Sequence, residues 1–161
     1  MGFFDFIKGA GKEPEKPEPV QRDTEMSAAD KQQVNNRRIA MGIAKHVEAM
    51  GFEIEDLAVK VDGDTATVSG TVADQATKER VVLTVGNTKG IARVEERIEV
   101  VKPEPEAQFH TVQSGESLSL IAKKYYGDAM KYPVIFEANK PMLSDPDKIY
   151  PGQVLRIPPV E

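Results

Sequence analysis

The placement of proline is the feature that most constrains the fold of this chain. Its 11 prolines lie in three groups, at positions 14–19, at 103–105 and from 133 onward. Because proline lacks a backbone N–H and interrupts helices and central strands, the proline-free stretch from Val20 to Lys102 is free to form regular structure. That stretch has the size of a small domain. A chain of 161 residues therefore divides more naturally into two small domains than into one large one.

The proline groups also indicate where linkers lie. Residues 12–26 and 103–108 mix proline with charged residues and offer almost no side chains to bury, which is typical of extended spacers. We therefore expect an N-terminal segment at 1–11, a first domain at 27–102 and a second domain at 109–161.

The N-terminal segment carries an apolar stripe. Phe3, Phe6, Ile7 and Ala10 recur at helical spacing on a segment too short to hold a helix alone. Such a stripe has to dock on another surface. We expect it to pack against the rest of the protein, and contact with a membrane or with a groove on a partner remains the alternative.

Hydrophobic periodicity predicts an α+β fold for the first domain. Apolar residues spaced by three and four favour a helix at 27–50, and alternating residues on both sides of 62–64 favour a β-hairpin. A second helix is expected at 74–85 and a third strand at 94–101. The order helix, strand, strand, helix, strand predicts two helices on one face of a three-stranded sheet.

The second domain has a shorter pattern, which predicts the order βααβ. A strand at 110–113 precedes a helix that Ser117 caps and Gly127 ends. A second helix holds Pro133 in its first turn, and a strand at 154–157 closes the domain. The domain is close to the lower size limit for folding without disulfides or metals.

Composition excludes several classes of function. With 21 basic and 26 acidic residues the net charge is −5, so the chain repels the phosphates of nucleic acids and of anionic membranes. The absence of cysteine excludes disulfides and thiol catalysis. No motif pairs His46 or His110 with a nucleophile or with spaced metal ligands. We therefore expect a non-enzymatic, cytoplasmic monomer with no export signal and no membrane span.

Two stretches of the chain resemble known domain families. FHTVQSGESLSLIAKKYYG at 109–127 and IYPGQVLRIP at 149–158 resemble a LysM domain. Residues 36–101 resemble a BON domain, through VSGTV at 68–72 and the glycine-containing loop before the last strand. Together they are similar to the family of small bacterial potassium-binding proteins that combine BON and LysM domains. The resemblance implies a cytoplasmic protein that binds K⁺ and acts in the response to osmotic or salt stress.

The turn after the second predicted helix is a candidate cation site. A helix C-terminus leaves carbonyls without intrahelical partners and carries partial negative charge. Gly86 and Gly90 allow a sharp turn that points several carbonyls at one spot, and uncharged carbonyl oxygens suit K⁺. A second segment is needed to complete the shell, and the N-terminal segment is the candidate. The predicted ligands are the backbone carbonyls of Ile7, Ala10, Lys12, Gly86, Thr88 and Ile91. The alternative is that both glycines serve only the turn.

The resemblance to LysM implies a second ligand, because LysM domains bind N-acetylglucosamine chains between their first loop and the loop before their last strand. By position, the candidate residues here are Ser114, Gly115, Glu116, Ser117 and Asn139. The alternative function is thus that of a peptidoglycan-binding protein of the cell envelope. Use of the LysM fold as an interdomain module or as a docking site for an unknown protein is equally open.

Overall fold

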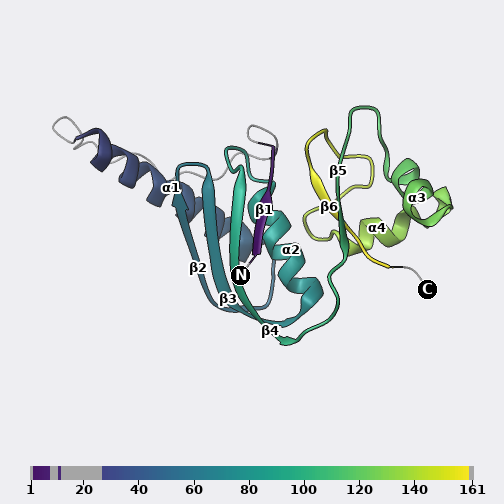
Figure 1. The fold of residues 1–161 in the computed structure, drawn as a ribbon, viewed down its shortest axis with the longest axis horizontal. Helices are drawn as coiled ribbons and strands as arrows, with labels where there is room; N and C mark the ends of the chain where they lie inside the picture. Colours follow the sequence, from purple (N-terminus) through teal and green to yellow (C-terminus); the bar gives the residue numbers. More distant parts are fainter. Residues whose placement is uncertain (1, 8–10, 12–26, 160–161) are drawn as a thin grey trace.

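The computed structural model describes residues 2–7, 11 and 27–159 and has the expected α+β fold. In chain order its elements are β1 Gly2–Asp5, α1 Ala28–Ala49, β2 Ile54–Asp62, β3 Thr65–Asp74, α2 Gln75–Gly86, β4 Arg93–Lys102, β5 Gln108–Thr111, α3 Leu118–Tyr126, the 3₁₀ turn η1 Ala129–Lys131, α4 Tyr132–Ala138 and β6 Val154–Ile157. We call β1–β4 with α1 and α2 the first unit, and the remaining elements the second unit. Figure 1 shows α2 between the sheet of the first unit and the second unit.

The first unit is a four-stranded sheet in the order β1-β4-β3-β2. β2 and β3 form the predicted hairpin, and Gly63 at its tip has a φ of +62°, which is why an Asp-Gly turn fits there. β3 and β4 are parallel, with α2 as the crossover between them. Both helices contribute to a single valine-rich core, so they cover the same face of the sheet.

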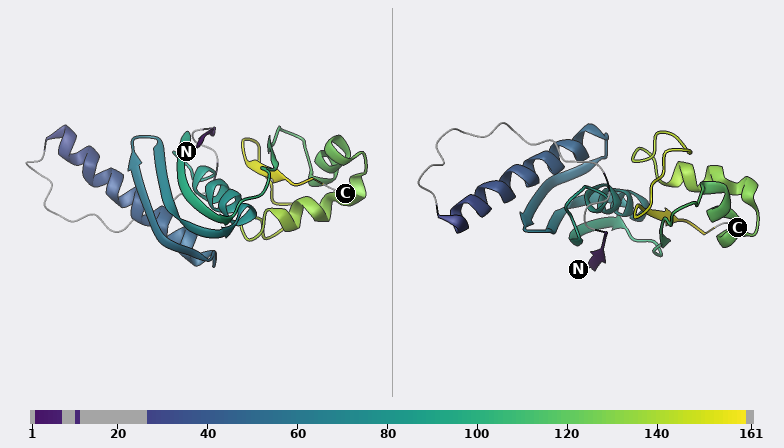
Figure 2. Two further views of the ribbon diagram at one scale, coloured as in Figure 1. Left: turned by 60° about the horizontal axis from the view of Figure 1, so that its bottom comes forward. Right: turned by 90° about the horizontal axis from the view of Figure 1, so that it is seen from above.

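α1 buries side chains through its C-terminal half, and Asn36 in its N-terminal half accepts a hydrogen bond from the N–H of Gly63. Its buried residues are Ala40, Gly42, Ile43 and Val47, whereas positions 28–33 are exposed. Figure 2 shows the N-terminal half projecting beyond the sheet in both views. Ser27 caps the helix as predicted, because its side chain accepts a hydrogen bond from the N–H of Asp30.

The structure of the N-terminal segment differs from the sequence-based expectation in two respects, its conformation and the number of strands in the sheet. Residues 2–5 form a strand, not part of a helix, and they extend the predicted three-stranded sheet to four strands. Phe4 and Phe6 pack on the core while Phe3 and Ile7 are 61% and 53% exposed, which is an alternation of period two. The physical reason is the free edge of β4, which satisfies the backbone of a segment too short to form a helix by itself.

The second unit has the predicted βααβ order, with η1 inserted between its helices. β5 and β6 pair antiparallel, and Ile121, Ile135 and Leu155 form the centre of a separate apolar core. Ser117 caps α3, and Gly127 ends it in the left-handed conformation with a φ of +74°. Both ends of this helix were predicted from sequence.

Of the two segments expected to be spacers, the structure describes the second, at 103–108, and not the first. Residues 12–26 lie outside the described part of the chain. Between β4 and β5 the chain has no regular structure up to Ala107, but Ala107 itself is buried and its N–H points at a carboxylate of the first unit. This second segment therefore packs against the protein at its C-terminal end.

Candidate functional site

The candidate cation turn follows a well-defined helix. α2 begins at the N-cap Asp74, whose carboxylate accepts bonds from the N–H of Thr77 at 2.8 Å and from its hydroxyl at 2.7 Å. These bonds hold the pKa of Asp74 below its ordinary value. At the other end the N–H of Asn87 bonds to Leu83 O at 2.9 Å. The last carbonyls of α2 thus face the turn, with the negative end of the helix dipole behind them.

The turn directs the side chains of Thr88 and Ile91 inward, whereas Lys89 at its tip is exposed. Ile91 is 1% exposed and belongs to the core of the first unit, and Thr88 is 4% exposed. The hydroxyl of Thr88 donates to Thr84 O at 3.1 Å, while its carbonyl accepts from the N–H of Ile91 at 3.1 Å. A carbonyl oxygen has two lone pairs, so Thr88 O keeps one acceptor site. Because the side chains serve the interior, backbone oxygens are the groups these positions offer to a ligand.

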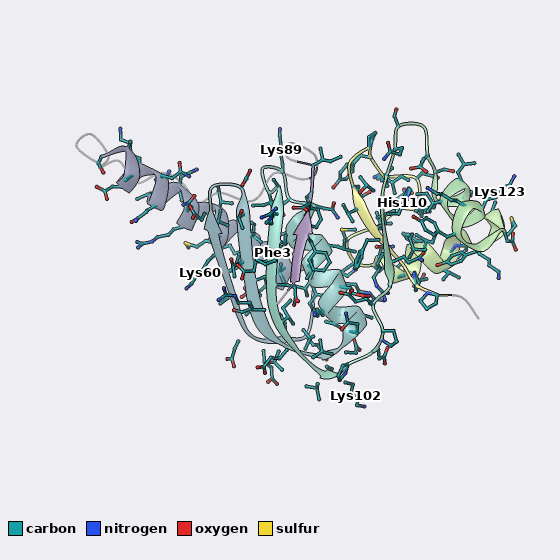
Figure 3. The ribbon with its side chains drawn as sticks, viewed as in Figure 1. Phe3, Lys60, Lys89, Lys102, His110 and Lys123 are labelled. Atoms are coloured by element: carbon teal, nitrogen blue, oxygen red, sulfur yellow. The ribbon has the colours of Figure 1, made fainter. Side chains whose placement is uncertain are left out.

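The N-terminal segment lies against this turn. The N–H of Phe6 bonds to Ala92 O at 2.6 Å, and the Phe6 ring covers Gly86 so closely that a Cβ there would lie 1.9 Å from the ring. Gly11, with a φ of +99°, approaches the carbonyl of Asn87 in the same way. Figure 3 labels Lys89 at the tip of this turn and Phe3 on the neighbouring strand.

The structure therefore places part of the predicted ligand set together. Ile7 directly follows Phe6, which contacts both ends of the turn that holds Gly86, Thr88 and Ile91. The remaining predicted ligands, Ala10 and Lys12, lie outside the described residues. Sequence reasoning correctly expected the segment to dock, but it did not anticipate that Gly86 is needed for contact with an aromatic ring.

The turn is also tied to the second unit, through a residue that sequence reasoning missed. The Asn87 side chain accepts from the N–H of Val154 and donates to the carbonyl of Val154, both at 2.8 Å. The Asn87 side-chain amide therefore makes the same pair of hydrogen bonds to β6 that a residue of a neighbouring strand would make with its backbone. The hydroxyl of Tyr150 lies 3.4 Å from the Asn87 carbonyl, and burial raises the pKa of Tyr150 to about 12.

A buried ion pair forms a second link between the units. Glu79 of α2 is 2% exposed, and its Oε1 accepts from Nε and Nη2 of Arg156 on β6 at 3.3 and 3.2 Å. The same carboxylate accepts from the N–H of Ala107. The signal in the sequence was Arg156 itself, an arginine inside the apolar strand VLRI, and a buried arginine requires an acidic partner.

The end of α4 makes a third link. Nε of Arg80 donates to Ala138 O at 3.2 Å, and Nη2 lies 3.4 Å from Glu137 O. A guanidinium at the last carbonyls of a helix is favoured by the helix dipole. Polar contacts from Glu79 and Arg80 of α2 and from Asn87, its C-cap residue, therefore hold the second unit.

The candidate glycan-binding residues differ in their exposure to solvent and in whether their side chains already have hydrogen-bond partners. Ser114 and Gly115 are exposed, and Ser117 is exposed but serves as the N-cap of α3. Asn139 is 2% exposed, and its amide bonds to the backbone of Ile135 and of Arg156. The Asn139 side chain thus supports the fold of the second unit, whereas Ser114 and Gly115 are accessible to a ligand.

The Glu116 carboxylate already has hydrogen-bond partners within its own unit. Its Oε1 accepts from the N–H of Gln113 at 2.6 Å and lies 2.9 Å from Nε2 of His110, whose Nδ1 lies 3.0 Å from the hydroxyl of Tyr125. Burial alone would raise the pKa of Glu116, but the bonds from His110 and Gln113 bring it below its ordinary value. Figure 3 shows His110 in the second unit. The network fixes the loop that carries Ser114 and Gly115.

The described residues lack two further kinds of site. Within residues 2–7, 11 and 27–159, His, Asp and Glu side chains form no group of three that could hold a metal ion. Over the same residues, no helix combines the length and the apolar character needed to cross a bilayer.

Comparison with known proteins identifies the two units. The BON domain family matches residues 35–102, and the LysM domain family matches residues 110–158. Over 159 residues the chain is 40% identical to the potassium binding protein Kbp of Escherichia coli, which covers 98% of this chain and 99% of Kbp. The chain belongs to the Kbp family. The first unit thus contains the BON domain, and the second contains the LysM domain.

Two further relatives match only part of the chain. An uncharacterized protein of Deinococcus radiodurans is 55% identical over 49 residues, 30% of this chain and 19% of that protein. The esterase Rv1288 of Mycobacterium tuberculosis is 43% identical over 53 residues, 33% of this chain and 11% of the esterase. In both relatives the similar stretch is a small part of a longer protein, whereas the similarity to Kbp spans both domains.

Proposed function

We propose that this chain is a cytoplasmic K⁺-binding protein whose ion lies between the N-terminal segment and the turn after α2. The ligands in this proposal are the backbone carbonyls of Ile7, Ala10, Lys12, Gly86, Thr88 and Ile91. The observation that carries it is the docking of Phe6 on Gly86, which brings Phe6 and the adjoining Ile7 to the carbonyl-rich end of a helix. The full-length similarity to a potassium binding protein supports the same ion.

The chemistry of the turn favours a large monovalent cation. The side chains of Thr88 and Ile91 face the interior, so these positions offer uncharged carbonyl oxygens, the kind of group that replaces the hydration shell of K⁺. Divalent ions prefer carboxylates, and the described residues hold no acidic cluster of the required kind. We therefore expect little response to Ca²⁺ or Mg²⁺.

We further propose that binding of the ion orders the two domains relative to each other. Asn87 lies between two of the proposed ligands, Gly86 and Thr88, and its side chain pairs with Val154 of the LysM domain. An ion that fixes the backbone of the turn would also fix this amide. Since a ligand shifts an ensemble only by binding one state better, the ordered, docked state is the one that K⁺ would select. We propose that this response acts in osmotic or salt stress, as the family resemblance implies.

The test compares melting temperatures in equal millimolar KCl and NaCl. Wild-type protein should melt higher in KCl, and Phe6→Ala should lose most of this K⁺ increment because the segment no longer docks on Gly86. Phe3→Ala is the matched control, since Phe3 is on the same strand but 61% exposed. Equal melting curves in the two salts for wild-type protein would refute K⁺ binding, and an unchanged increment in Phe6→Ala would refute this site.

Coupling between the domains has a separate test. Hydrogen exchange of amides in β5 and β6, other than that of Val154, should slow in KCl in the wild type but not in Asn87→Ala. If K⁺ slows exchange equally in both proteins, the ion orders the LysM domain by another route.

Glycan binding by the LysM domain is the second candidate, favoured by the family match and by the exposed loop at Ser114 and Gly115. Sedimentation with purified peptidoglycan measures it directly. Retention that Gly115→Asp abolishes would support this function, and absence of retention at any K⁺ concentration would exclude it.

A further inference from the structure

A pocket of about 290 Å³ lies at the junction of the two domains. The C-terminal ends of α1 and α2 form one side of it, through residues that include Met50 and Thr84, and the loop between α4 and β6 forms the other. A water molecule needs only some 10–15 Å³ of such space. The pocket is therefore too large for a single bare ion and has the size of a small organic molecule.

One buried polar atom in the lining lacks a partner. Gln153 is 3% exposed, and its Oε1 has no hydrogen bond within the described part of the chain. The backbone of Gln153 is held on both sides, because its N–H bonds to Tyr150 O and its carbonyl accepts from Val112. The side chain is thus presented from a fixed position, and a buried acceptor without a donor is unfavourable until a donor arrives.

Three hydroxyl groups around the pocket are acceptors too. Thr84 donates its proton to Arg80 O at 2.8 Å, Thr88 donates to Thr84 O at 3.1 Å, and Tyr150 donates to Asn87 O at 3.4 Å. A hydroxyl has one proton and two lone pairs, so each of these oxygens can only accept from a ligand. Tyr150 keeps its proton at neutral pH because its pKa is about 12.

The local electrostatics favour a positive head group. Two helix C-termini end at the pocket, and each contributes partial negative charge from its last carbonyls. Lys148 and His46, which also line it, have the opposite preference. Lys148 is exposed, so its ammonium is suited to a carboxylate at the rim, away from the inner acceptors.

From this arrangement we propose that the junction pocket binds a small molecule with a primary ammonium group, of the class of free α-amino acids. The ammonium would donate to Gln153 Oε1 and to the hydroxyl oxygens, and the carboxylate would meet Lys148. A ligand held by residues of both domains stabilises their docked arrangement. This site adjoins the proposed K⁺ site, and Thr88 belongs to both, with its hydroxyl facing the pocket and its carbonyl among the proposed K⁺ ligands.

The experiment uses the full chain at constant KCl. The twenty L-amino acids, ethanolamine and glycine betaine are screened by thermal shift, and responding compounds are titrated by calorimetry. At least one amino acid should raise the melting temperature with saturation, whereas glycine betaine, which has no N–H on its ammonium group, should not. Ethanolamine has the ammonium group but no carboxylate. If it binds as tightly as the responding amino acid, the ligand is a simple amine; if it binds more weakly, the carboxylate contributes and the ligand is an amino acid. No response to any amino acid or to ethanolamine, or an equal response to glycine betaine, would overturn the proposal.

Two variants locate the site. Gln153→Met keeps the length of the side chain but removes the acceptor, and should weaken binding at least tenfold, while Gln113→Met on the exposed face of the same domain should have no effect. The K⁺ increment of the melting temperature should persist in Gln153→Met, which separates this proposal from the K⁺ site. Lys148→Ala, at an exposed position, should weaken the amino acid but not ethanolamine. Wild-type affinity in Gln153→Met would refute the assignment.

Discussion

The helix α2 is buried on two sides, and the two sides are held by different chemistry. Toward the sheet it presents Val81, Val82 and Val85, which belong to the core of the BON domain. Toward the LysM domain it presents Glu79 and Asn87, whose partners lie at hydrogen-bond distance on β6. Apolar packing tolerates changes of similar volume, whereas each polar contact fails without its partner. The sheet side therefore maintains the fold, and the LysM side specifies a single docking geometry.

The ion pair on the LysM side should give the largest effect. Glu79→Ala leaves Arg156 buried without its partner and should lower the free energy of unfolding by about 3–5 kcal/mol, measured by urea denaturation. Glu79→Met with Arg156→Met should lose less than the sum of the single variants. The exposed pair Glu137–Lys140 is the control, because Lys140→Ala should cost about 0–1 kcal/mol. Additive losses at Glu79 and Arg156 would show that the two faces do not differ as described.

A substitution on the sheet side of α2 should lower the free energy of unfolding by less and should leave the response of the LysM domain to K⁺ unchanged. Val82→Ala removes buried methyl groups and should cost about 2 kcal/mol. Because this change does not touch β6, hydrogen exchange within β5 and β6 should slow in KCl as much as it does in the wild type. A selective increase of exchange in the LysM domain would instead show that packing on the sheet sets the docking geometry.

The start of α2 should give the smallest effect, since it belongs to neither side. Asp74→Ala removes the N-cap and should cost about 1 kcal/mol at neutral pH. The folded pKa of Asp74 lies below 3.8, so its contribution is fully present above that pH and is lost as the pH falls through the lower folded value. The difference in stability between wild type and Asp74→Ala should thus shrink below pH 3.8. A constant difference down to pH 2 would contradict this.

Local patterns predicted most of the fold. Ser27, Asp74 and Ser117 each cap a helix as expected, and the Asp-Gly turn and Gly127 have the positive φ that their positions require. These features depend on residues within a few positions of one another. The docking of the N-terminal segment was predicted, but its strand conformation was not, because that conformation depends on β4, some 90 residues away in the sequence.

In the candidate site, too, features that depend on neighbouring residues were predicted and features that depend on distant residues were missed. The turn after α2 was identified from a helix end and two glycines, which are local signals. Asn87 and Glu79 were missed because their partners are 67 and 77 residues away, and each resembles an ordinary polar surface residue in its local context. Asn139 was assigned by position in a family, and that assignment could not reveal that its amide is used inside the domain.

The strand β1 has a consequence beyond the site. It covers the outer edge of β4, whose backbone would otherwise present open donors and acceptors to any passing strand. If the N-terminal segment leaves the turn, this edge is uncovered together with the apolar surface under Phe4. If the proposed K⁺ holds the segment in place, a chain without the ion would expose this edge to a second copy, so the segment would protect against aggregation in addition to its proposed role as a source of ligands.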